Sequence, residues 1–123
     1  MRYIAEANRR RKWRTSGCAP WQFNESWPNA SCTNSLDYYG GVRPAYWGMR
    51  TAYAPRLFSL KYSGLRHEPG SEFSAELWMN LSLPNTAPDC VRWVAWDLET
   101  CACLGEGRVT PPSSGEGDPE PVC

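Results

Sequence analysis

The chain has 123 residues and a formal net charge of zero, which fits one domain or a piece of a larger one. A zero net charge excludes a global field directed at nucleic acid or a membrane surface, and no apolar run reaches the roughly 18 residues of a membrane span. Eleven Pro and ten Gly exclude a long helical bundle, while seven Trp and six Tyr favour stacking surfaces or a wide apolar interface. The N-terminus lacks the apolar stretch of a secretory leader, so a cytoplasmic location is the default expectation.

Residues 1–14 predict a helix with a short apolar stripe and five basic side chains in residues 9–14. Cations in the last turns of a helix suit the negative end of its dipole, and Gly17 is placed to stop the helix. With Trp13 among them, these bases also resemble a nucleic-acid patch. The rest of the sequence offers no matching basic surface, so we interpret the bases as a solvated outer helix face and expect no nucleic-acid partner.

Residues 18–24 predict a short strand that leads into the densest aromatic and polar stretch of the chain. Residues 21–41 read W-Q-F-N-E-S-W-P-N-A-S-C-T-N-S-L-D-Y-Y-G-G. A sugar ring presents C–H faces that stack on indole, and a hydroxyl rim that hydrogen-bonds to amides and carboxylates. The stretch therefore indicates a sugar site, or else a core strand whose aromatic side chains pack inward.

Residues 44–55 predict a second helix, because Pro44 suits its first turn and Pro55 ends it. A helix, a strand, a polar loop and another helix form half of an α/β repeat. In barrels built from such repeats, the chemistry lies on the loops that follow the strands.

After Pro55 the apolar period changes from 3.6 to 2. Residues 58–62, 73–79 and 91–96 alternate apolar and polar side chains and are separated by turn-rich segments. This pattern predicts an antiparallel sheet or half of a sandwich. Residues 105–123 are rich in Pro, Gly, Ser and acid, which predicts a disordered tail.

Six unevenly spaced cysteines do not form the pattern of a disulfide scaffold. The pair Cys101-x-Cys103 is too tight for a zinc knuckle, and the single histidine, His67, lies in a polar, turn-rich stretch. We therefore expect no metal and no cofactor. A small oxidised secreted interaction domain remains an alternative, which counting of free thiols would test.

The residues W-Q-F-N-E-S-W-P-N-A-S-C-T-N-S-L-D-Y-Y-G, followed by R-P-A-Y-W-G-M-R-T-A-Y-A-P, resemble the end of the catalytic barrel in glycoside hydrolase family 2. The similarity is to the β-mannosidase-like branch, which includes exo-β-glucosaminidases, and it covers about residues 1–62. It implies that residues 1–55 are the last helix–strand–helix of a (β/α)8 TIM barrel. Residues 56–104 would then be part of an antiparallel immunoglobulin-like β-sandwich, and residues 105–123 the disordered tail.

This resemblance implies a fragment of a retaining exo-glycosidase that hydrolyses a β-mannoside or related β-glycoside. Family members use two glutamates, at the ends of the fourth and seventh barrel strands, and both positions precede this chain. We therefore expect no catalytic residue here and a need for the missing N-terminal barrel segment. Glu25 and Glu72 imitate the family's two glutamate motifs, but their neighbours place Glu25 on the eighth strand and Glu72 after the last barrel helix.

By the same resemblance, five residues are candidates for substrate binding. Trp21 would form an aromatic platform for the sugar, and Trp27 would line the rim of the pocket. Three polar residues would hydrogen-bond sugar hydroxyls or hold neighbouring side chains: Gln22, Asn24 and Glu25. Residues 37–39 would fold the loop back on the barrel. The alternative is a non-catalytic carbohydrate-binding module built on the aromatic-rich β region. In either case the expected partner is a carbohydrate, without a membrane.

Overall fold

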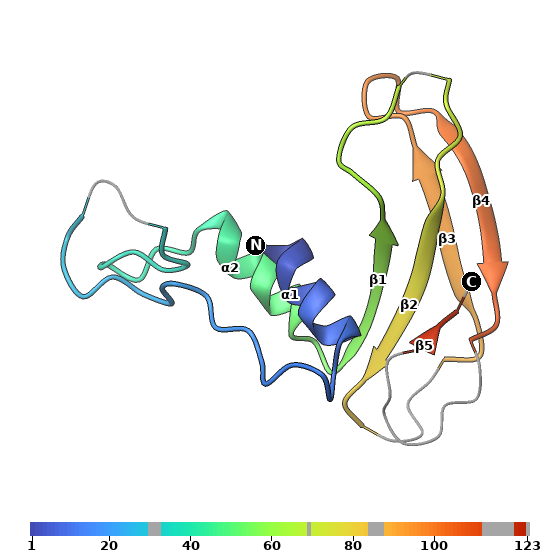
Figure 1. The fold of residues 1–123 in the computed structure, drawn as a ribbon. Helices are drawn as coiled ribbons and strands as arrows, with labels where there is room; N and C mark the ends of the chain where they lie inside the picture. Colours follow the sequence, from blue (N-terminus) through green and yellow to red (C-terminus); the bar gives the residue numbers. More distant parts are fainter. Residues whose placement is uncertain (30–32, 69, 84–87, 112–119, 123) are drawn as a thin grey trace.

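The computed structural model describes residues 1–29, 33–68, 70–83, 88–111 and 120–122. Within them the chain is mixed α/β, with two helices and two antiparallel sheets (Figure 1). The elements are α1 (Arg2–Arg10), α2 (Pro44–Ala52), β1 (Arg56–Tyr62), β2 (Ala75–Leu81), β3 (Val91–Trp96), β4 (Cys103–Val109) and β5 (Glu120–Pro121). None of the described helices is long and apolar enough to cross a membrane.

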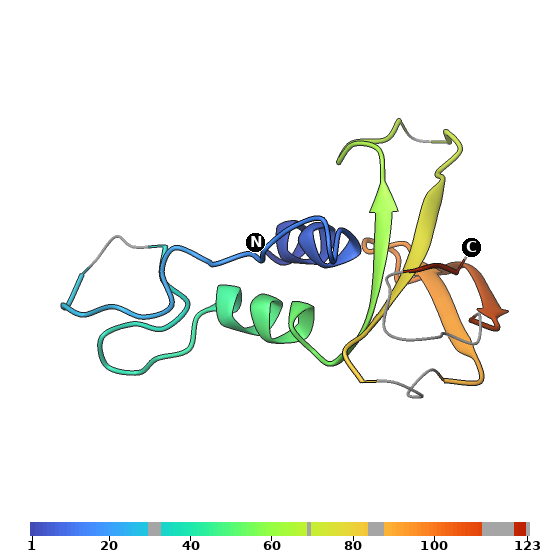
Figure 2. The same ribbon diagram turned by 60° about the horizontal axis from the view of Figure 1, so that its bottom comes forward.

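The two helices lie side by side against one sheet, and the segment between them extends away from both sheets (Figures 1 and 2). We call residues 18–43 the arm, and α1, α2, β1 and β2 together the body. The helices meet at a small cluster of buried residues formed by Ala5, Met49 and Ala52. Two of these three are alanines, so the helix backbones approach closely. Pro44 begins α2 as predicted.

α1 ends at Arg10, earlier than the predicted Arg14, and its basic side chains contradict the predicted solvated face at two positions. Arg9 donates from Nη1 to the carbonyl oxygens of Ala52, at 2.7 Å, and Ala54. Arg10 is buried and donates to Ser59 Oγ over 3.0 Å. The last carbonyls of a helix have no partner within it, so the guanidinium group of Arg9 completes the end of α2. Burial lowers the pKa of Arg9.

The main sheet has the strand order β1–β2–β5 and confirms the predicted change to a period of two. Along β2, one face buries Leu77, Met79 and Leu81. The opposite face lies toward α1, where Asn80 Nδ2 donates to the carbonyl of Arg9 over 3.2 Å. Polar contacts between α1 and the sheet therefore add to the apolar burial of the body.

The second sheet pairs β3 with β4, so the predicted disorder after residue 104 is wrong for residues 105–109. Trp93 lies opposite Gly107, and a Cβ atom added to Gly107 would lie 2.6 Å from Trp93 Nε1. The glycines that contributed to the predicted tail instead leave room for this indole on the strand. β5 contradicts the predicted disorder at residues 120–121 as well, and the rest of the tail lies mainly outside the described residues.

The predicted strand at residues 18–24 is absent from the structure. The one bridge in this segment joins Asn24 to Leu36, and it does not extend into a ladder. A strand requires a continuous line of backbone partners on a neighbouring strand. Here the segment meets a loop of its own arm and remains irregular.

Candidate functional site

All five predicted substrate-binding residues lie on the arm, whose backbone is held mainly by its own hydrogen bonds. Leu36 donates from its backbone N–H to the carbonyl of Phe23 over 2.9 Å, and its carbonyl accepts from the N–H of Glu25 at 3.1 Å. The N–H of Ser35 donates to the carbonyl of Gln22 over 3.2 Å. Residues 22–25 and 35–36 are thereby placed side by side.

The side chain of Glu25 fixes this arrangement, and Glu25 is buried, with only 6% of its surface exposed. One carboxylate oxygen accepts from Arg43 Nη2 at 3.0 Å, and the other accepts from the backbone N–H of Tyr38 at 3.2 Å. The carboxylate therefore joins three separate stretches of the arm. Both oxygens of Glu25 therefore hold neighbouring groups of the arm, the Arg43 side chain and the Tyr38 backbone, in place.

Asp37 closes a tight turn next to Glu25. The backbone N–H of Gly41 donates to Asp37 Oδ1 over 2.6 Å, and the N–H of Asp37 donates to the carbonyl of Gly41 over 3.0 Å. Gly40 adopts a φ of +83°, a left-handed conformation that favours glycine. The turn presents Tyr39 to solvent with 82% of its surface exposed.

The aromatic side chains of the arm point outward. Trp21 and Trp27 are 78% and 75% exposed. The carbonyl of Trp21 accepts from Thr33 Oγ1 at 2.9 Å, and the Trp21–Gln22 peptide bond is cis. The alternative of a core strand with inward-packed aromatic side chains is therefore wrong for these two tryptophans, because their faces remain open for stacking.

A hollow of about 350 Å³ lies beside this turn. Of the five predicted residues, it is lined by Glu25 alone. The other four, Trp21, Gln22, Asn24 and Trp27, lie elsewhere on the arm. The remaining lining residues are Pro28, Asn29, Asp37, Tyr39 and Arg43. Sequence reasoning missed Arg43, because its position before a helix-starting proline gives no sign of an ion pair eighteen positions away.

Three buried polar atoms of the arm lack a hydrogen-bond partner among the described residues: Asn34 Oδ1, Ser35 Oγ and Arg43 Nε. Buried polar groups in folded proteins are almost always satisfied. These three atoms within residues 34–43 leave hydrogen-bonding capacity unused inside the arm.

The arm is tied to the body where it begins. The hydroxyl group of Tyr53, just after α2, donates to the carbonyl of Cys18. Burial raises the pKa of Tyr53, and the neighbouring Cys18 raises it further. Because the neutral phenol is the hydrogen-bond donor, this contact belongs to the protonated form.

Metal-ligating groups do not gather in the described part of the chain, where no three His, Cys, Asp or Glu side chains are placed to hold an ion. Cys18, Cys90, Cys101 and Cys103 are free thiols. Cys32 and Cys123 lie outside the described residues.

Comparisons with models of protein families, with curated protein sequences and with solved structures found no match to this chain.

Proposed function

We propose that this chain forms one wall of the sugar pocket in a retaining exo-glycosidase of the β-mannosidase-like branch of glycoside hydrolase family 2. The substrate class is a β-mannoside or a related β-glycoside. The observation that carries this proposal is the outward display of Trp21, Trp27 and Tyr39 on an arm whose shape is held by the paired carboxylate of Glu25. Open aromatic faces next to fixed polar groups are what a pyranose ring requires.

Each candidate residue has a role that follows from its exposure. Trp21 stacks on the C–H face of the sugar, and Trp27 closes the rim. The exposed amide of Asn24 and the half-buried amide of Gln22 supply donors and acceptors for hydroxyl groups. Glu25 keeps Arg43 in place and makes no direct contact with the substrate.

The chemistry of the reaction then comes from carboxylates outside this chain. A retaining glycosidase places two carboxyl groups about 5–5.5 Å apart on either side of the scissile bond. Glu25 is unsuited to that work because both of its oxygens already accept hydrogen bonds. In the proposed enzyme, a preceding part of the protein supplies both glutamates.

The barrel architecture belongs to this proposal as well. Residues 1–55 would be the last helix–strand–helix unit of a (β/α)8 barrel, and residues 56–104 would belong to a β-sandwich. One feature supports a covering segment, namely the unsatisfied buried atoms of Asn34 and Ser35. Neighbouring barrel strands would provide the missing partners.

The test measures hydrolysis of p-nitrophenyl β-mannoside and p-nitrophenyl β-glucosaminide by the 123-residue chain and by the longest product of its reading frame. We expect turnover from the longer product alone. There, Trp21→Ala should lower kcat/KM by about 10- to 100-fold, since removing one aromatic platform costs about 1–3 kcal/mol of transition-state binding. Trp47→Ala, which changes an exposed tryptophan on α2, is the matched control and should leave kcat/KM unchanged. A frame without an upstream catalytic portion, or full activity in Trp21→Ala, would contradict the proposal.

A non-catalytic carbohydrate-binding module is the second candidate, and the β3–β4 sheet favours it. The Trp93 indole lies against Gly105 and Gly107 and stays 44% exposed, which gives a flat surface for a sugar ring. Such a module would bind mannosides without hydrolysis. Loss of the tryptophan fluorescence response to mannosides in Trp93→Ala, with Trp21→Ala unaffected, would favour this candidate over the first.

A further inference from the structure

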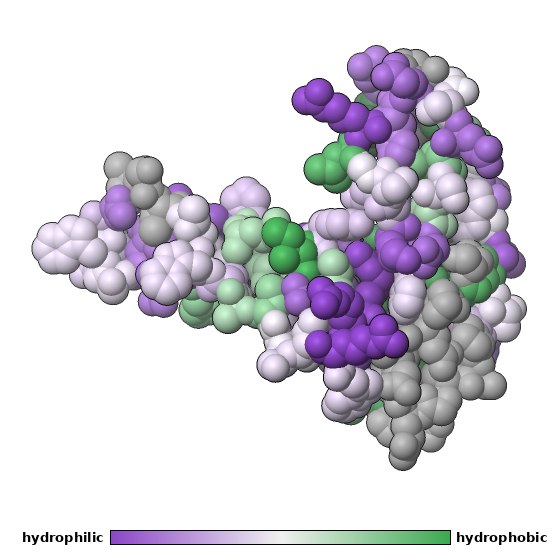
Figure 3. All heavy atoms as spheres, viewed as in Figure 1, coloured by the Kyte–Doolittle hydropathy of each residue, from purple (hydrophilic) through white to green (hydrophobic). Residues whose placement is uncertain are grey.

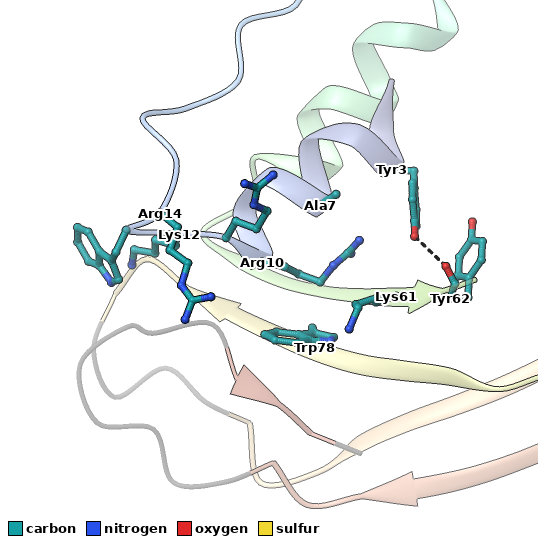
Figure 4. A pocket seen from close by; sticks show the side chains of 10 residues that line it. Tyr3, Ala7, Arg10, Lys12, Arg14, Lys61, Tyr62 and Trp78 are labelled. Atoms are coloured by element: carbon teal, nitrogen blue, oxygen red, sulfur yellow. Dashed lines mark hydrogen bonds between the residues drawn. The ribbon is translucent and has the colours of Figure 1, made fainter. Parts of the chain in front are cut away.

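A hollow of about 830 Å³ lies away from the arm, between the end of α1 and the strands β1 and β2. Figure 4 shows Arg10 and Arg14 approaching this space from the helix side and Lys61 and Trp78 approaching it from the sheet. The residues that form it are thus brought together only by the packing of α1 on the sheet.

Five cationic side chains line this hollow: Arg10, Arg11, Lys12, Arg14 and Lys61. Four of them follow one another near the end of α1, and β1 brings in the fifth. Figure 3 shows strongly hydrophilic residues gathered where α1 ends against the sheet. The fold thus adds Lys61, which is paired with Glu76 at 2.6 Å, to the basic side chains that follow one another along the sequence.

Two tryptophans accompany these charges. Trp13 is 75% exposed and adopts a left-handed backbone conformation with φ of 70°, which is uncommon for a residue other than glycine. The ammonium group of Lys12 lies 4.7 Å from the centre of its ring. Trp78 is half-buried on β2, with Lys61 Nζ 5.8 Å from its ring centre. Each indole face is thus adjacent to a cation.

The hollow differs in chemistry from the sugar site on the arm. None of the described lining residues is Asp, Glu, Asn or Gln, but Glu76 borders the hollow, where its carboxylate accepts from Lys61 Nζ at 2.6 Å and from Trp78 Nε1 at 2.9 Å. The donors for anions are therefore mainly the exposed guanidinium groups of Arg11 and Arg14. A ligand that fits must combine repeated negative charge with flat aromatic groups.

We propose that this hollow binds single-stranded nucleic acid. Phosphate oxygens would lie against Arg11 and Arg14, since guanidinium groups bind phosphate through two parallel hydrogen bonds. Bases would stack on Trp13 and Trp78. Grooves that bind single strands without sequence preference combine positive charge along the backbone with aromatic platforms for the bases.

Fluorescence anisotropy of a labelled oligothymidylate, titrated with the 123-residue chain over a series of salt concentrations, tests this proposal. The double variant Arg11→Ala/Arg14→Ala should bind at least about tenfold more weakly. The slope of the logarithm of the binding constant against the logarithm of the salt concentration (the salt slope) should become less steep by about 1.4. This is about 0.7 for each of the two phosphates that the variant no longer neutralises. Trp13→Leu should weaken binding about tenfold without changing the slope, because stacking releases no counterions.

Arg50→Ala is the matched control, because Arg50 also lies over an exposed tryptophan, at 5.4 Å from the ring of Trp47, but on α2 outside the hollow. It should keep the affinity and the salt slope of the parent chain. Equal losses of affinity in Arg50→Ala and in the double variant would overturn the proposal. So would binding to heparin in the absence of oligonucleotide binding, which would assign the hollow to acidic polysaccharides. Far-UV circular dichroism of each variant confirms that the fold is retained.

Discussion

The body and the arm of this protein place charge and aromatic surface in opposite ways. In the body, Met79 is 1% exposed, and Arg9 and Arg10 complete a helix end and a strand. In the arm, a carboxylate is buried while Trp21 and Trp27 lie in solvent. The body is thus stabilised by its own apolar burial, whereas the arm keeps its shape by polar pairing and leaves its large aromatic side chains exposed.

The largest loss of stability should follow when a substitution creates a cavity among the buried side chains of the body. Met79→Ala removes one of the most deeply buried side chains of β2 and should lower the free energy of unfolding by about 2–5 kcal/mol. Chemical denaturation followed by circular dichroism measures this change. Met1→Ala, which truncates an exposed methionine, is the control and should cost less than about 0.5 kcal/mol. Similar costs for both variants would show that the sheet has no specific core.

A smaller, local effect should follow from breaking the polar pairing of the arm. Glu25→Ala removes the partner of Arg43 and of the Tyr38 N–H, and should cost about 1–3 kcal/mol. The cost stays below that of a fully buried pair because the Arg43 side chain is 36% exposed. Amide hydrogen exchange should speed up in residues 22–25 and 35–37 while β1 and β2 keep their protection.

The control for Glu25→Ala is Glu106→Ala, which removes an ion pair with Arg92 on the surface of the β3–β4 sheet. Exposed pairs contribute about 0–1 kcal/mol, so exchange in the arm should not change. Uniform acceleration across arm and body in Glu25→Ala would mean that the two regions unfold together, and the arm would then not keep its shape by its own pairing.

The connection between the two regions should depend on pH through Tyr53. The pKa of Tyr53 is raised in the folded chain. The contribution of its hydroxyl group to the stability of the fold is therefore complete below the ordinary tyrosine pKa of about 10, and it is lost as the pH rises through the pKa of Tyr53 in the folded chain. Tyr53→Phe should release the start of the arm at every pH, at a cost of about 1 kcal/mol. Tryptophan anisotropy against pH should show an alkaline step in the parent chain and in the control Tyr39→Phe, and none in Tyr53→Phe.

The smallest change in the free energy of unfolding is expected when an exposed aromatic side chain of the arm is removed. Trp27→Ala should change the free energy of unfolding by less than about 0.5 kcal/mol, because the side chain is 75% exposed. Thermal or chemical melts measure it. A decrease of more than about 1 kcal/mol would mean that Trp27 packs within the arm, which would remove it from the proposed pocket rim.

Local patterns predicted much of the body. The alternation at residues 58–62, 73–79 and 91–96 predicted three strands, and Pro44 placed the start of α2. Both patterns depend only on residues that are close in the sequence. Successive side chains of a strand point to opposite faces, which gives the period of two, and proline suits the first turn of a helix. The strand predicted at residues 18–24 failed because a strand depends on partners that a local pattern does not contain.

The candidate site shows the same limit. The composition of residues 21–41 indicated a sugar-binding surface, and Trp21 and Trp27 do lie exposed. The pairing of Glu25 with Arg43 was not predictable, since it joins residues eighteen positions apart through an irregular loop. The role of Glu25 therefore became clear only when its two partners were seen.

The sequence by itself determined the strand periods, the helix that follows Pro44 and the aromatic and amide content of the arm, because these depend on residue type and short-range geometry. Tertiary structure alone decided which charges are buried and which surfaces are open. In the folded chain, Arg9 and Arg10 donate hydrogen bonds to α2 and β1. Lys61 and Trp78 lie opposite the basic end of α1. Contacts between distant segments depend on how the helices pack on the sheet, and no local pattern in the chain records that packing.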